Sequence, residues 1–252
     1  MHFIAGATAR QLARIAGGLY LINILGGAFA IGIVPAMLIV SGDASATALN
    51  IRSHDLLYRS GLVAHVVILV TNVVMAVIFW DLFKVVDRRL AMLAALFSIV
   101  GTAVEAGSLL NQFVPLILLG NGPAANGLPL PQAQALSYLS ANLAEIGYSI
   151  YSAFFGSLAI CRGYLVYRST FLPRAIGVLL ALGGVSYAIY GLTHILAPSF
   201  SAHLVPWIQL PSLVGEGSFT LWLLFKAVNV RRWTERASAA IGPRPMTVKE
   251  PA

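Results

Sequence analysis

The chain has 252 residues, of which 58% are hydrophobic and only 10% are charged. A soluble domain usually has about 25% charged residues, so this balance is typical of a membrane protein. The net charge of +7 does not indicate a nucleic-acid partner, because the basic residues mark the segments between apolar runs and do not cluster on one soluble face. The single cysteine, Cys161, excludes an intrachain disulfide and a multi-cysteine metal site.

Six apolar runs are long enough to cross a hydrocarbon core of about 30 Å. The first is too long for a signal-peptide core, so we expect it to be retained as a span. The fold class predicted is therefore all-α, a polytopic bundle of six transmembrane helices. The expected spans are residues 15–40, 61–85, 90–119, 141–166, 175–196 and 207–228.

The segments between the spans are expected to be turns and loops. Residues 41–60 read as a polar loop, 84–89 as a tight charged turn, 120–134 as an irregular loop rich in Gly and Pro, and 198–206 as a further loop. A short basic turn with Arg162, Arg168 and Arg174 is expected after the fourth span.

The chain divides into three parts on this pattern. We expect a cytoplasmic lead over residues 1–14, the transmembrane domain over 15–229, and a disordered basic tail over 230–252. With the N-terminus inside, Arg52 and Arg59 alone among the 16 lysines and arginines fall on the outer side. The excess of positive charge on inner segments predicts that both termini are cytoplasmic.

Polar residues recur every three or four positions within several spans. Asn142, Glu145, Ser149, Ser152 and Gly156, for example, share one narrow stripe of a helix. Because a carboxylate is unfavourable in hydrocarbon, such stripes should face protein or water. If the stripes face one another, they form a polar chamber in the outer half of the membrane. The candidate ligand-binding residues are Glu105, Glu216, Glu145, His65, Asn72, His194 and Arg59.

These residues also have structural interpretations. The three glutamates are expected to lie close to one another or to Arg52 and Arg59, yet each could simply bond a polar group on a neighbouring helix. His65 and His194 could form interhelical hydrogen bonds or an axial pair for haem or a metal. No hydrolase elbow, zinc motif, phosphate loop or dinucleotide fingerprint occurs. We therefore assign no catalytic residue, metal ligand or cofactor.

Short motifs occur in order between residues 12 and 229. They include Ala13-Arg14-Ile15-Ala16-Gly17, Gly42-Asp43-Ala44, Tyr58-Arg59-Ser60-Gly61, Phe171-Leu172-Pro173-Arg174 and Leu221-Trp222-Leu223-Leu224. On these motifs the chain resembles the bacterial membrane family catalogued as domain-of-unknown-function family 4386. The resemblance implies a multi-span helical protein of the bacterial inner membrane and implies no particular activity.

Three functions stay open on the sequence. The first is a non-enzymatic protein whose chamber binds or passes a small lipophilic ligand, a lipid or a proton. The second is a structural or regulatory membrane protein whose basic cytoplasmic face docks a protein partner or anionic lipid. The third is a membrane redox or lipid-modifying enzyme that uses His65 and His194.

Overall fold

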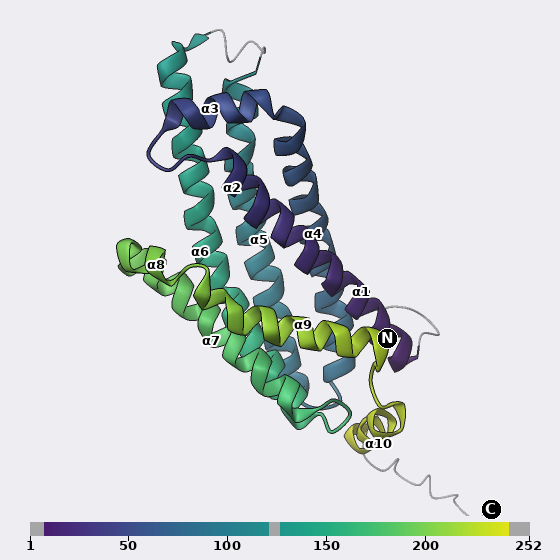
Figure 1. Cartoon of the computed structure of the whole chain (residues 1–252). Coiled ribbons are helices and arrows are strands. Elements are labelled where there is room, and N and C mark those ends of the chain that lie inside the picture. Colours follow the sequence, from purple (N-terminus) through teal and green to yellow (C-terminus); the bar gives the residue numbers. More distant parts are fainter. Residues whose placement is uncertain (1–7, 121–126, 242–252) are drawn as a thin grey trace, which may run out of the picture.

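A computed structural model describes residues 8–120 and 127–241, and within them every regular element is helical (Figure 1). Five segments are long and apolar enough to cross a membrane, which confirms the all-α class and the membrane character. They are Ala9–Leu38 (α1, the π-helical turn η1 and α2), Asp55–Phe83 (α4), Arg88–Leu118 (α5), Leu130–Arg168 (α6) and Arg174–Leu196 (α7).

The remaining helices are shorter. Within the first segment, α1 covers Ala9–Gly27, η1 covers Ala28–Ile33 and α2 covers Val34–Leu38. Outside the five segments lie α3 (Ala44–Ser53), α8 (Pro198–Leu204), the 3-10 turn η3 (Trp207–Gln209), α9 (Leu210–Phe225) and α10 (Val230–Ile241). The sixth predicted span falls on η3 and α9, and α9 alone has 16 residues.

Several loops predicted from composition are helical instead. Residues 44–53 form α3 because Asp43 caps the helix, its side chain accepting a hydrogen bond from the Ala46 amide at 2.8 Å. Residues 198–204 form α8, and α6 begins at Leu130, inside the predicted loop 120–134. Residues 230–241, expected to be disordered, form α10; the rest of that tail and residues 1–7 and 121–126 lie outside the described residues. The charged turn at 84–89 is present, and Asp87 caps α5.

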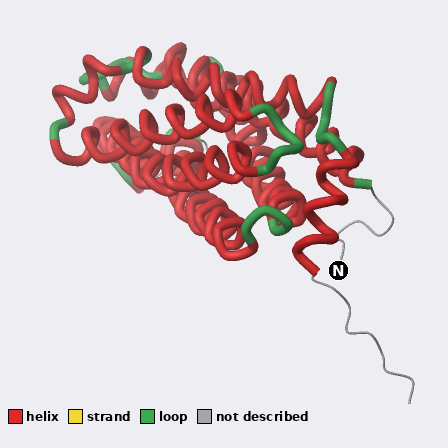
Figure 2. Tube along the Cα trace, turned by 90° about the horizontal axis from the view of Figure 1, so that it is seen from below, coloured by secondary structure: helices red, strands yellow, loops and turns green. Residues whose placement is uncertain are grey.

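Six helical segments pack in a closed ring. Following the contacts, α1 packs on α4, α4 on α5, α5 on α6, α6 on α7, α7 on α9, and α9 on α1 again. Helix α3 lies across one end of this ring and α10 lies at the other end (Figure 1), and a perpendicular view shows short loops joining the helices (Figure 2). Large apolar side chains such as Leu25, Val63 and Leu110 are exposed on the outside, as expected for a surface that faces lipid.

The buried apolar residues form two clusters rather than one. The larger cluster, which includes Phe79, Phe83 and Phe219, joins α1, α4, α5, α6, α7 and α9. The smaller one, which includes Leu38 and Leu62, joins α2, α3, α4, α5 and the start of α6 near the end that α3 covers. The space between the two clusters is where polar side chains gather.

The tightest helix pair, α6 and α7, is joined by small residues that recur every seven positions. Ser149, Gly156 and Gly163 on α6 face Gly191, Gly184 and Gly177 on α7 in antiparallel order. A Cβ atom added at Gly163 would lie 2.6 Å from the Gly177 carbonyl oxygen, and one added at Gly184 would lie 2.7 Å from the Gly156 carbonyl oxygen. The two backbones are therefore in direct contact, as in small-residue packing of membrane helices.

Helix α10 is fixed to the bundle by its one tryptophan. The Trp233 indole Nε1 donates a hydrogen bond to the Leu82 carbonyl oxygen at the end of α4, at 3.0 Å, and its ring packs on the larger core cluster. Arg236 donates to the Arg168 carbonyl oxygen at 3.0 Å. The basic helix is thus held against the ends of α4 and α6.

We expect Trp233→Phe to loosen α10 without unfolding the bundle, because the ring stays and one hydrogen bond of about 1 kcal/mol is lost. Limited trypsin digestion in detergent should cleave α10 several-fold faster in Trp233→Phe, and faster still in Trp233→Ala. The exposed Ser238 provides the control, since Ser238→Ala should be cleaved at the wild-type rate. Equal rates in all four proteins would contradict this docking.

Candidate functional site

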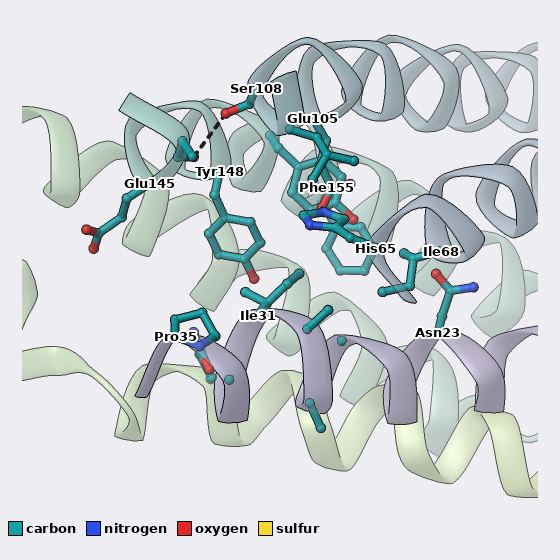
Figure 3. Close-up of a pocket in the computed structure, with 18 of the residues that line it drawn as sticks. Asn23, Ile31, Pro35, His65, Ile68, Glu105, Ser108, Glu145, Tyr148 and Phe155 are labelled. Carbon is teal, nitrogen blue, oxygen red and sulfur yellow. Dashed lines mark hydrogen bonds and ion pairs between the residues drawn. The ribbon is translucent and has the colours of Figure 1, made fainter. Parts of the chain in front are cut away.

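A cavity of about 1040 Å³ lies inside the ring of helices, between the two apolar clusters. Its walls come from all six segments of the ring, and most of its polar lining comes from α4, α5, α6 and α9. Five of the seven candidate residues named from the sequence line it: Glu105, Glu216, Glu145, His65 and Asn72. Figure 3 shows His65, Glu105 and Glu145 in its wall.

His65 and Glu105 form a buried pair at the wall of this cavity. His65 Nε2 lies 2.9 Å from Glu105 Oε1, joining α4 to α5, and the two residues are 4% and 2% exposed. Each side chain keeps one buried atom without a hydrogen-bond partner, His65 Nδ1 and Glu105 Oε2. An unpaired buried polar atom costs roughly 1–3 kcal/mol, so the pair has unused bonding capacity that a bound molecule could satisfy.

Glu216 belongs to a second polar group at the α1, α6 and α9 walls. Its carboxylate accepts a hydrogen bond from the Ser212 hydroxyl, one turn earlier on α9, and its charge interacts with that of Arg162 on α6. Arg162 Nη1 donates to the Tyr20 hydroxyl at 3.2 Å, and the guanidinium lies 4.3 Å from the centre of the Phe79 ring. Arg162 is thereby enclosed by its aromatic neighbours.

Arg162 is not in a turn, contrary to the prediction. Helix α6 continues to Arg168, so Arg162 is a membrane-helix residue that is 4% exposed. An arginine near the end of an apolar run resembles a loop charge, so the sequence alone does not show that Arg162 is buried within α6. The sequence signal for this position is the spacing of the two arginines: Arg162 precedes Arg168 by almost two helical turns, so it lies deeper in the helix.

Glu145 and Asn72 line other parts of the cavity. Glu145 is the exposed member of the acidic set, and in Figure 3 its carboxylate points away from the His65–Glu105 pair. Asn72 is 9% exposed and lies two turns from His65 on α4. Next to it, Thr71 accepts a hydrogen bond of 2.6 Å from the Asn23 amide, which ties α4 to α1.

Aromatic rings form a continuous wall on α6 and α7, which we call the aromatic wall. Tyr148 and Tyr151 have ring centres 5.7 Å apart, Tyr151 and Phe155 5.6 Å, and Phe155 and Tyr187 4.8 Å. Tyr190 extends the wall from Tyr148, at 6.2 Å. All five rings line the cavity, as Glu105 does.

Opposite the aromatic wall, the lining is apolar and comes from η1, α2 and the start of α9. The first segment changes from α- to π-helix at Ala28–Ile33, a distortion that is often found at functional sites. In Figure 3 the Tyr148 ring points toward Ile31 and Pro35 on this side. Val205 and Leu213 line the cavity from the neighbouring segment.

Two candidate residues lie elsewhere. Arg59 is exposed and pairs with Asp55 at 2.7 Å, one turn away on α4, and Arg52 is exposed on α3, so neither arginine balances the glutamates. His194 does not line the cavity that His65 lines; it is half-buried near the end of α7, with its ring centre 5.8 Å from that of Tyr190. The structure therefore does not bring His65 and His194 together at this site. Among the described residues, no group of three or more His, Cys, Asp or Glu side chains could hold a metal ion.

Comparisons with known proteins give a family match and one relative. The family model described as Domain of unknown function (DUF4386) matches residues 15–227. A protein of Archaeoglobus fulgidus that carries the name "Uncharacterized protein" is 26% identical over 164 residues, which are 63% of this chain and 78% of the relative. No solved structure matches the chain.

Proposed function

We propose that this chain, which belongs to the family Domain of unknown function (DUF4386), is a multi-pass membrane protein that binds a small lipophilic ligand within its helical ring. One observation carries the proposal: two buried atoms, His65 Nδ1 and Glu105 Oε2, have no partner in the wall of a cavity of about 1040 Å³. Ligand sites are usually cavities of roughly 300–1,000 Å³, mostly apolar, with a few placed polar groups.

A purely structural role explains the His65–Glu105 contact less well. Helix-to-helix bonds between buried polar groups stabilise a bundle when each member is satisfied, and a half-satisfied pair is worse than apolar packing. The Asn23–Thr71 bond between α1 and α4 differs in this respect, because neither of its side chains keeps a buried polar atom without a partner.

The topology proposed has six spans and both termini in the cytoplasm. Residues 207–225, η3 and α9 together, extend about 28 Å at 1.5 Å per residue, which matches the sixth span. Helix α10 and the α6–α7 turn then lie inside, with their arginines, and α3 lies outside.

Two single-cysteine proteins test this orientation in a Cys161→Ala background. A membrane-impermeant maleimide should label Ser45→Cys, near the start of α3, on intact cells. It should label Ser238→Cys, on α10, only after the membrane is opened. Both serines are exposed, so accessibility is matched. The reverse pattern would overturn the orientation. Labelling of both proteins on intact cells would contradict a total of six spans, because α3 and α10 would then lie on the same side of the membrane.

Native mass spectrometry of the chain purified in mild detergent tests ligand binding. We expect a co-purifying small molecule that is lost in Ala141→Trp, because the indole would occupy the cavity from α6. Ala103→Trp is the matched control, since Ala103 is exposed on α5 and outside the cavity lining. A bound molecule that persists equally in both variants would place it outside the cavity and contradict the proposal.

A docking role is the second candidate, and one observation favours it. Arg231 and Arg232 are exposed on α10, so the cytoplasmic end of the bundle presents positive charge to a partner or to anionic lipid. A stoichiometric protein partner that still co-purifies after Glu105→Gln and Glu216→Gln would support docking in place of ligand binding.

A further inference from the structure

We infer that the ligand is an organic cation with an apolar body, which places its positive charge between the Glu105 carboxylate and the aromatic wall. This inference rests on the proposed function and names the chemical class of the molecule bound. It follows from three features of the cavity: the hydrogen-bonding character of its free atoms, its charge balance and its aromatic lining.

The free atoms of the buried pair accept hydrogen bonds. When the His65 imidazole is neutral and the Glu105 carboxylate is ionised, Nε2–H donates to Oε1 across 2.9 Å. The two atoms left without a partner, His65 Nδ1 and Glu105 Oε2, are then both acceptors. In this protonation state the pair offers two acceptors, each in a side chain that is more than nine-tenths buried, and these are complementary to a donor or a positive charge.

The charges that line the cavity are unbalanced. Three carboxylates line it, from Glu105, Glu145 and Glu216, while Arg162 is the one lysine or arginine in its lining as far as the chain is described. Arg162 is already engaged by Glu216 and by the Tyr20 hydroxyl. Glu105, on α5, has a histidine as its hydrogen-bonding partner. When that histidine is neutral, the buried charge of Glu105 has no counterion, which is unfavourable. A cation beside Glu105 would supply that counterion.

The aromatic wall suits the same ligand. Its rings lie on α6 and α7 and line the same cavity as Glu105. Aromatic faces attract ammonium-type cations, and sets of several rings recognise quaternary ammonium groups. An anion would meet both the carboxylates and the ring faces, which repel it.

The test uses two lipophilic ions of nearly equal size and opposite charge, tetraphenylphosphonium and tetraphenylborate, with triphenylmethanol as a neutral probe. Equilibrium dialysis measures the binding of each to the full chain in one non-ionic detergent. We expect tetraphenylphosphonium to bind most tightly, and Glu105→Gln to weaken it about tenfold, because the charge is lost while the shape is kept. Glu235→Gln, which removes an exposed carboxylate on α10, is the control and should bind as the wild type does.

The outcomes separate this inference from the proposed function. Equal binding of all three probes, unaffected by Glu105→Gln but abolished by Ala141→Trp, would overturn the cation and leave the ligand cavity standing. Binding of none of the three would overturn both. If Glu105→Gln does not fold, Glu145→Gln and Glu216→Gln test the other two carboxylates of the cavity. A preference for tetraphenylphosphonium over tetraphenylborate that is unchanged in both variants would support Glu105 as the selecting group, and a preference lost in either would overturn that assignment.

Discussion

Gly184→Leu is expected to prevent assembly of the helical ring. Gly184 lies at the centre of the α6–α7 contact, where an added Cβ would be 2.7 Å from the Gly156 carbonyl oxygen and 2.8 Å from the Ile160 amide nitrogen. These are backbone atoms, so no side chain can rotate to relieve the overlap, and the two helices must separate. We expect destabilisation of about 3 kcal/mol or more, since even one extra methylene in a packed interior costs about 1–3 kcal/mol.

Thermal unfolding followed by size-exclusion chromatography in one detergent measures this effect. Gly184→Leu should elute as aggregate or unfold roughly 10 °C below the wild type. Gly107→Leu is the matched control: Gly107 is a helical glycine on α5 with no atom within 4 Å of an added Cβ, so it should behave as the wild type. A stable, monodisperse Gly184→Leu protein would show that α6 and α7 are not in backbone contact.

Glu105→Leu is expected to destabilise the protein strongly, and adding His65→Leu is expected to restore most of the loss. The single substitution keeps the volume and leaves the 4% exposed His65 without its partner. Breaking a buried pair by removing one member costs about 3–5 kcal/mol, whereas apolar residues replacing both members are often neutral. Stability restored in the double variant would show that the fold does not require this polar pair.

A double-mutant cycle in thermal unfolding checks this expectation. Glu105→Leu alone should unfold well below the wild type, while the His65→Leu, Glu105→Leu double variant should return to within about 1 kcal/mol of it. The double variant should nevertheless lose the molecule that co-purifies with the wild type. Additive effects of the two single substitutions would contradict a direct contact between His65 and Glu105.

The sequence was informative about the helices and about which polar residues face inward. Charge in an apolar run is unfavourable toward lipid, and this simple rule predicted that Glu105 and Glu216 face the interior, where both line the cavity. The pairing of His65 with Glu105 could not be predicted. It depends on how α4 is rotated and shifted along its axis relative to α5. The hydrophobic pattern does not determine these two quantities, because both helices are apolar on several faces.

The errors have physical causes as well. The sequence predicts Arg52 and Arg59 as the basic groups nearest the glutamates, because Arg162 follows a long apolar run and resembles a turn residue. Enclosure by Tyr20 and Phe79 lets that arginine lie inside a membrane helix. His194 shares its helix face with Tyr187 and Tyr190, but it lies one turn beyond Tyr190 and outside the cavity lining.

The sequence carries a signal for the antiparallel α6–α7 contact. Small residues recur at intervals of seven on both sides of the Ser169–Pro173 turn, in Ser149, Gly156 and Gly163 and again in Gly177, Gly184 and Gly191. Two such series joined by a short turn would have predicted close packing of the helices.

An experimental density map of the chain extracted with its native lipids would test the ligand site most directly. A molecule occupying the ring, with a positively charged group about 3 Å from Glu105 Oε2 and beside the Tyr148 and Tyr151 rings, is the result that agrees with the structure. A ring filled by its own side chains, or a Glu105 carboxylate that faces lipid, would contradict it.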